Sequence, residues 1–177
     1  MQPLLQVNLS TRSITKINVP EEWEVQYIGG ASLGARILYK DLTHSLDPLS
    51  AEAPLLFING PLSGTAGPAV GRFVVCAKSP ATGLWGESNC GGFWGPELRM
   101  AGYDGLWIIG RSETPVYLVI NDENIEFRSA LHLWGMDTYS TQAALRNEIN
   151  LKNPRIAVIG QAGEARIPFA LIMNVQK

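Results

Sequence analysis

The sequence predicts an α+β fold built from two β-rich halves related by a pseudo-twofold duplication, with helices packed on one side. Hairpin patterns, in which apolar and polar residues alternate around a polar turn, occur at 5–19 and again at 116–130. Each hairpin precedes a glycine and a helical segment, over 29–42 and 134–149, and each helix precedes a short apolar strand, at 55–60 and 155–160. Because the elements recur in the same order, a duplication is favoured.

The helices and strands of both halves carry their own local signals. Leu33, Ile37 and Leu38 share one face of the first helix, and Asp137 stands where an N-cap of the second helix belongs. The apolar strands end in glycine-containing turns, at 60–64 and 160–163. These signals predict two copies of a hairpin, helix and strand.

Only the first half continues beyond this point. A strand at 73–77, a glycine-rich turn at 86–92, a helix at 96–101 and a strand at 106–109 follow in the first half. Pro96 and Glu97 favour a helix start, and Gly102 a helix end. The second half has no equivalent, so we expect one domain over 1–177, with half-repeats at approximately 1–111 and 112–177 and the second half truncated.

Composition narrows the class of protein. The 177 residues are 46% hydrophobic and 17% charged, with a formal net charge of −2. The balance of charge gives no basic surface, so no nucleic-acid partner is expected. No apolar run approaches the ~18 residues of a membrane span, so no membrane partner is expected either. Without a signal peptide, and with only Cys76 and Cys90, the chain fits a reducing, cytoplasmic setting.

The glycine-rich turn is the candidate binding element. It surrounds Ser88-Asn89-Cys90, and its bare backbone N–H groups, with those of the following helix start, could hold an anionic group such as a phosphate. The alternative is a tight strand-to-helix turn without a ligand. Tyr103 and Asp104, after the helix, are expected to hydrogen-bond the turn as structural support.

Two side chains near this turn have both a binding and a structural interpretation. Arg72 could clamp a phosphate through two N–H groups, or it could form a surface ion pair with Glu87 or Glu97. Asn89 could offer its carbonyl oxygen to a hard cation, or it could cap the local backbone in an Asx turn. Cys90 has no second Cys or His nearby, so a zinc or iron–sulfur site held by this chain is not supported.

These residues resemble the N-terminal domain of aldehyde ferredoxin oxidoreductases, and the resemblance spans nearly all 177 residues. Within the candidate region the matching segments are Gly71-Arg72-Phe73, Lys78-Ser79-Pro80, Thr82-Gly83, Ser88-Asn89, Gly91-Gly92, Gly95-Pro96-Glu97-Leu98 and Ala101-Gly102-Tyr103-Asp104. Outside it they are Gly29-Gly30, Leu33-Gly34-Ala35-Arg36, Asp47-Pro48-Leu49, Gly60-Pro61-Leu62, Leu133-Trp134-Gly135, Ile159-Gly160 and Ala162-Gly163-Glu164.

The resemblance implies an oxidoreductase that oxidises aldehydes to carboxylic acids and passes electrons to ferredoxin. Its tungsten or molybdenum would lie between two pterins, and its [4Fe–4S] cluster would be bound by regions outside this chain. The remaining domains of a full-length enzyme and the aldehyde would be its other partners, and this chain alone would be inactive. The alternatives are a standalone, non-catalytic binding module of the same fold, or part of a related enzyme that reduces aromatic thioesters.

Site residues follow from the resemblance position by position. Arg72 would contact a pterin phosphate, and Asn89, Gly91 and Gly92 would contact the same cofactor. Asn89 could also give its oxygen to an Mg²⁺ ion that joins the two pterin phosphates. Cys90 stands where the family usually has serine. No catalytic residue is assigned, and the family's second pterin loop would follow residues 172–174.

Overall fold

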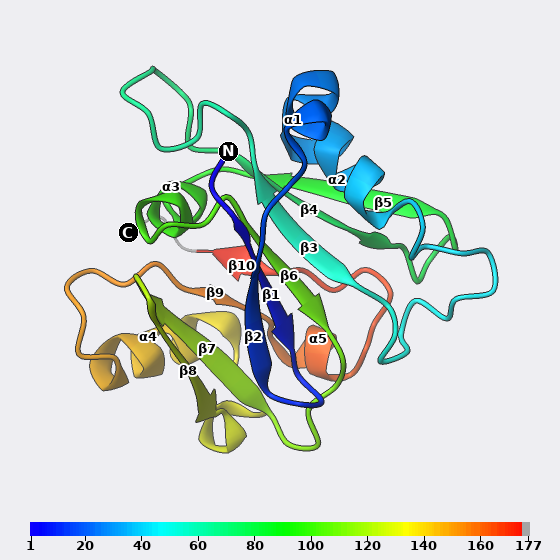
Figure 1. Ribbon diagram of the computed structural model, residues 1–177. Helices are drawn as coiled ribbons and strands as arrows, with labels where there is room; N and C mark the ends of the chain where they lie inside the picture. Colours follow the sequence, from blue (N-terminus) through cyan, green and yellow to red (C-terminus); the bar gives the residue numbers. More distant parts are fainter. Residues whose placement is uncertain (175–177) are drawn as a thin grey trace.

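The computed structural model describes residues 1–174, and its centre is a six-stranded mixed sheet (Figure 1). The strand order is β2-β1-β6-β3-β4-β5. Their bounds are β1 Leu4–Asn8, β2 Ser13–Ile17, β3 Leu55–Asn59, β4 Phe73–Lys78, β5 Trp85–Cys90 and β6 Gly105–Ile109. Only β1 and β6 are parallel neighbours. All six strands of this sheet precede residue 110 in the chain. The mainly antiparallel sheet, together with the helices, confirms the predicted α+β class.

Both faces of this sheet are buried, which explains why β3, with the sequence LLFIN, shows no polar alternation. On one face the sheet packs against α1 (Glu21–Tyr27) and α2 (Gly30–Leu38), with Leu33 and Leu38 in that core. On the other face lies α3 (Trp94–Met100), which contributes Leu98. The prediction that the helices pack on one side is therefore wrong, because each apolar face needs its own cover.

The second half adds two small sheets beneath the α3 face (Figure 1). The hairpin of β7 (Val116–Asn121) and β8 (Asn124–Ser129) forms one of them, and β9 (Ala157–Val158) with β10 (Met173–Asn174) forms the other. The other elements are η1 (Leu131–Leu133), α4 (Thr138–Glu148) and α5 (Gln161–Glu164). Side chains of α4, β7 and β9 form a separate core on the far side of the hairpin.

Most of the predicted elements are present. Asp137 is the N-cap of α4, and its carboxylate accepts hydrogen bonds from the N–H groups of Tyr139 (2.8 Å) and Ser140 (3.0 Å). The predicted apolar strands at 55–60 and 155–160 are present as β3 and β9, and each has an antiparallel neighbour. Ile58 of β3 pairs with Val74 of β4, and Val158 of β9 pairs with Met173 of β10. The duplication itself stays a prediction, and residues 175–177 of the second half-repeat lie outside the described residues.

The predicted glycine-rich turn at 86–92 is wrong over most of its length. Residues 85–90 form strand β5, in which Asn89 pairs with Val74 of β4. β5 is the last strand of its sheet and has a neighbour on one side only, so its polar side chains remain in water. Only Gly91, Gly92 and Phe93 connect β5 to α3.

A buried lysine fixes the long connection between α2 and β3. Lys78 is 7% exposed, and its ammonium donates to the carbonyl oxygens of Thr43 (2.9 Å), His44 (2.8 Å) and Leu46 (2.7 Å). All three N–H donors thus have an acceptor, which compensates the loss of water around the charge.

None of the helices within residues 1–174 has the length and apolar character needed to cross a membrane.

Candidate functional site

Arg72 and Asn89 meet at the outer edge of the six-stranded sheet. Arg72 lies just before β4, and Asn89 lies on β5 beside it. The Arg72 Nε donates to the Asn89 Oδ1 at 2.6 Å, and Nη2 donates to the Asn89 backbone carbonyl at 3.4 Å. Both residues are exposed. The guanidinium is thus held in place by a neutral amide, and its charge remains available to an anion.

The structure does not show the alternative roles considered for these two residues, a surface ion pair of Arg72 and an Asx turn at Asn89. Arg72 forms no ion pair among residues 1–174, and Glu97 instead lies 3.7 Å from Arg155. The Asn89 side chain accepts from Arg72 and does not cap the local backbone of an Asx turn. The two candidate residues that the sequence singled out therefore contact one another directly.

Gly91 and Gly92 lie beside this pair because two backbone segments touch. A Cβ atom added to Gly71 would stand 2.6 Å from the Gly92 carbonyl oxygen, closer than a real Cβ ever lies. Gly92 itself has φ +100°, a conformation that favours glycine. The Gly91 carbonyl accepts a hydrogen bond from the Asn174 Nδ2 at 3.1 Å. The segment before β4 and the loop before α3 thus form one continuous surface, with β10 behind it.

A buried polar network supports the backbone under Arg72. Asn59, 1% exposed, donates from Nδ2 to the Gly95 carbonyl at 3.0 Å and accepts from the Ser63 hydroxyl at 3.2 Å. The Ser63 hydroxyl also lies 3.5 Å from the Arg72 carbonyl oxygen. The turn after β3 is thereby tied both to the start of α3 and to the candidate arginine.

Arg99 joins this network to the core. Its Nε donates to the Asp104 Oδ1 at 2.5 Å, and its Nη1 donates to the carbonyls of Pro61 and Ser63, both at 2.7 Å. Asp104 is fully buried, and its other oxygen accepts from the Gln2 N–H at 2.7 Å. Asp104 therefore supports the turn after β3 through Arg99. It does not do so through the predicted hydrogen bond to residues 86–92, because its two carboxylate oxygens accept from Arg99 and Gln2.

Tyr103 was expected to share that supporting role, but its hydroxyl donates to the carbonyl of Asp122 at 3.3 Å. Sequence reasoning did not find Arg99. The only signal was a basic residue in the last turn of the helix, which is common for reasons of helix polarity alone.

The protein supplies little to a metal ion here. Among residues 1–174 no group of three or more His, Cys, Asp or Glu side chains is placed to hold one. Cys76 is buried, and burial, with a smaller contribution from the charge of Glu87, raises its pKa to about 12. Cys90 is half-buried and free. The site is therefore suited to binding an anion, and any metal within it would depend on ligands from outside this part of the chain.

Comparisons with known proteins identify the family of this chain. The family model for the N-terminal domain of aldehyde ferredoxin oxidoreductase matches residues 4–177. The chain belongs to the aldehyde ferredoxin oxidoreductase family. A tungsten-containing aldehyde ferredoxin oxidoreductase of Pyrococcus furiosus is 43% identical over 170 residues, which are 96% of this chain and 28% of that protein. The corresponding protein of Pyrococcus horikoshii is 41% identical over 97% of the chain.

More distant members carry other names. The WOR-like subunit of an aliphatic sulfonate oxidoreductase of Pyrococcus furiosus is 33% identical over 97% of the chain. A solved structure, the active-site complex BamBC of benzoyl coenzyme A reductase with 1,5-dienoyl-CoA, matches 98% of this chain with a TM-score of 0.95 and 36% identity. The chain spans about a quarter to a third of the length of these relatives, so the shared part is the N-terminal domain of the family.

Proposed function

We propose that this chain is the domain on which the pterin cofactor of an aldehyde-oxidising enzyme lies, with Arg72, Asn89, Gly91 and Gly92 against a pterin phosphate. One observation carries the proposal: the Arg72 guanidinium is held by Asn89 at an exposed edge, next to a glycine pair. A phosphate is bound best by a planar guanidinium that offers two N–H groups, and glycine lets such a ligand approach the backbone.

The residues present fit this cofactor. Phosphate groups bring negative charge, which the exposed Arg72 guanidinium, without an ion pair among residues 1–174, can neutralise. Tungsten or molybdenum would be held by the pterins themselves, so the proposal requires no cluster of His, Cys, Asp or Glu ligands from this chain. Asn89 could still serve an Mg²⁺ ion between the phosphates, because a carbonyl oxygen has a second lone pair besides the one that accepts from Arg72.

When bound, the metal–pterin cofactor would supply the two-electron oxidation of an aldehyde to a carboxylic acid. The role of this chain is to position the cofactor and to neutralise its charge. Electrons would leave through a [4Fe–4S] cluster held elsewhere in the enzyme to ferredoxin or a similar carrier. The free thiols of Cys76 and Cys90 are compatible with the proposed cytoplasmic setting.

A second candidate function is a reduction carried out with the same kind of cofactor. The TM-score of 0.95 to a benzoyl coenzyme A reductase complex favours it, since that relative acts on an aromatic thioester according to its name. The higher identity to aldehyde ferredoxin oxidoreductases, 43% against 36%, supports aldehyde oxidation as the first choice.

The test is the metal content of the full-length protein carrying Arg72→Ala, measured by elemental analysis. We expect several-fold less bound tungsten or molybdenum than in the wild type. Arg72→Lys should lose less, because it keeps the charge without the planar fork. Arg111→Ala, which removes another exposed arginine side chain, is the matched control and should leave the metal content unchanged. Wild-type metal content in Arg72→Ala would remove Arg72 from the site.

A further inference from the structure

The loop that joins β5 to α3 is held by side chains from the second half of the chain. Its residues are Gly91, Gly92 and Phe93. Asn174 on β10 donates from Nδ2 to the Gly91 carbonyl oxygen at 3.1 Å. Arg155, two residues before β9, lies over the Phe93 ring, with its guanidinium carbon 4.6 Å from the ring centroid. The conformation of this loop therefore depends on residues far along the chain.

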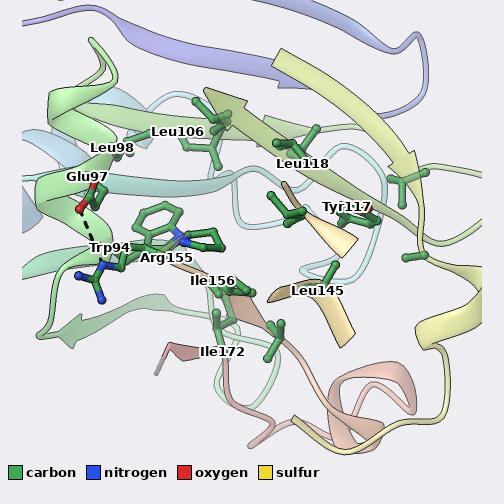
Figure 2. A pocket seen from close by; sticks show the side chains of 18 of the residues that line it. Trp94, Glu97, Leu98, Leu106, Tyr117, Leu118, Leu145, Arg155, Ile156 and Ile172 are labelled. Atoms are coloured by element: carbon green, nitrogen blue, oxygen red, sulfur yellow. Dashed lines mark ion pairs between the residues drawn. The ribbon is translucent and has the colours of Figure 1, made fainter. Parts of the chain in front are cut away.

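The contact of Arg155 restrains a side chain of the loop. The Arg155 Nε lies 3.7 Å from the Glu97 Oε1 at one side of an apolar cavity of about 680 Å³ (Figure 2). Glu97 stands on α3, which begins directly after Phe93. Arg155 thus connects the second half to both the loop and the helix. A cation over a ring sets the position of the ring, but it sets the direction of no backbone N–H or C=O group.

The two peptide groups within the loop are restrained in different ways. The Gly92 carbonyl oxygen lies so close to Gly71 that a Cβ atom there would stand 2.6 Å from it. This packing fixes the peptide group between Gly92 and Phe93. The peptide group between Gly91 and Gly92 depends on a hydrogen bond instead, because among residues 1–174 its carbonyl accepts from the Asn174 amide alone.

This hydrogen bond sets the direction of a backbone donor. A peptide group is planar and trans, so its C=O and its N–H point in opposite directions. Since the Gly91 carbonyl points to Asn174 on β10, the N–H of Gly92 points away from β10. Glycine has no Cβ, so a peptide group between two glycines can turn over at little steric cost. Turning over would replace the N–H donor with a carbonyl oxygen on the side of the loop away from β10.

We propose that Asn174 is a positioning residue of the anion site, which keeps the Gly92 N–H, and not the Gly91 carbonyl, directed at the bound phosphate. The inference rests on the proposed function, because it takes the phosphate beside Arg72 and Asn89 as the ligand. Backbone N–H groups bind phosphate oxygens as donors, whereas a carbonyl oxygen in the same place repels them. Asn174 acts through the peptide group and needs no contact with the phosphate.

The same bond makes the site of the first half depend on the second half. Asn174 lies on β10, where it pairs with Ala157 of β9. The donor at Gly92 therefore has a fixed direction only when β9 and β10 are paired. Without that pair, Arg72 and Asn89 would still attract an anion, but the backbone N–H beside them would have no fixed orientation.

The test is hydrogen exchange of the Gly92 N–H in the full-length protein, made in a host that cannot synthesise pterin cofactors, with inorganic phosphate as the probe. In the wild type, phosphate at ten times its dissociation constant should slow this exchange about tenfold. In Asn174→Ala the slowing should fall to about twofold, because losing one directed hydrogen bond to a charged group weakens binding about tenfold. The matched control is Asn124→Ala, which removes an amide that donates to Glu126 at 3.0 Å on the β7–β8 hairpin. It should behave like the wild type.

A second readout is the metal content of the full-length protein made with its cofactor. Asn174→Ala should bind several-fold less tungsten or molybdenum, and Asn124→Ala as much as the wild type. Asn174→Leu fills the space of the amide without a donor, so it should match Asn174→Ala in both readouts. Exchange over 55–59 and over 157–158 should stay unchanged in these variants, because β3 and the β9–β10 pair do not need the Asn174 side chain. If Asn174→Ala loosens β9, Asn174→Leu is the variant to compare.

The outcomes separate this inference from the proposed function. If phosphate slows the Gly92 exchange as much in both Asn174 variants as in the wild type, the inference is wrong and the proposed function stands. Faster exchange over 157–158 in both variants would also overturn it, since Asn174 would then support the β9–β10 pair and not one peptide group. If phosphate does not slow the exchange even in the wild type, the loop binds no phosphate, and the proposed function fails together with the inference.

Discussion

Replacing Arg99 with alanine should destabilise the first half of the domain by about 3–5 kcal/mol. The reason is that Asp104 is fully buried and its Oδ1 accepts a hydrogen bond from Arg99. Removing one partner of a buried pair leaves an uncompensated charge in the interior. The same change also frees the carbonyl groups of Pro61 and Ser63, which accept from the Arg99 Nη1. A loss of this size is a large fraction of the ~5–15 kcal/mol that stabilises a typical domain.

Urea denaturation of the wild type, both single alanine variants and the double variant would measure this free energy of unfolding. Since Arg99 and Asp104 act as a unit, the double variant should cost less than the sum of the single variants, by on the order of 2 kcal/mol. Arg99→Lys should fall between wild type and Arg99→Ala, because one ammonium cannot reach the carboxylate and both carbonyls in the same fork geometry. In Arg99→Ala, limited proteolysis should cut first in the turn at 60–64, because the carbonyls of Pro61 and Ser63 lose their hydrogen-bond donor.

The reasoning fails if Arg99→Ala costs less than about 1 kcal/mol, the value of an exposed pair. It also fails if the two single effects simply add. Either result would mean that water reaches Asp104 and replaces the guanidinium.

Two further predictions concern the site and the core. Gly71→Ala should lower the bound metal of the full-length protein, because its Cβ would collide with the Gly92 carbonyl; Gly60→Ala, with nothing within 4 Å of the added atom, should not. If Gly71→Ala binds as much metal as Gly60→Ala, the close approach of Gly71 to the Gly92 carbonyl is dispensable for metal binding. Burial raises the pKa of Cys76 to about 12, so at pH 8 it stays a protonated thiol and should resist alkylation unless the protein unfolds, whereas Cys90 should react. Labelling of Cys76 in the folded protein would contradict this.

Local signals in the sequence were sufficient for the elements that depend on near neighbours. The two hairpins follow from alternation around polar turns, and α4 follows from Asp137, which binds the N–H groups two and three residues later. α1 was not predicted. It is seven residues long and contributes no fully buried residue, so its apolar pattern is weak.

Features that depend on distant contacts could not be predicted in the same way. β5 resembles a turn in sequence because it carries Ser88 and Asn89, and only its pairing with β4 makes it a strand. The lack of alternation in β3 was a readable sign that both sheet faces are covered, and it argues against helices on one side only. Arg72 and Asn89 were found, yet their mutual hydrogen bond depends on the neighbouring positions of β4 and β5, which no local pattern fixes.

The Lys78 side chain has a consequence for how the surface connection at 43–46 keeps its shape. Three carbonyl oxygens converge on one positive centre, which is the arrangement that many loops achieve with a bound calcium ion. Here the cation is covalently part of the chain. It cannot dissociate or be chelated, so this loop keeps its conformation whatever the supply of divalent ions in its surroundings.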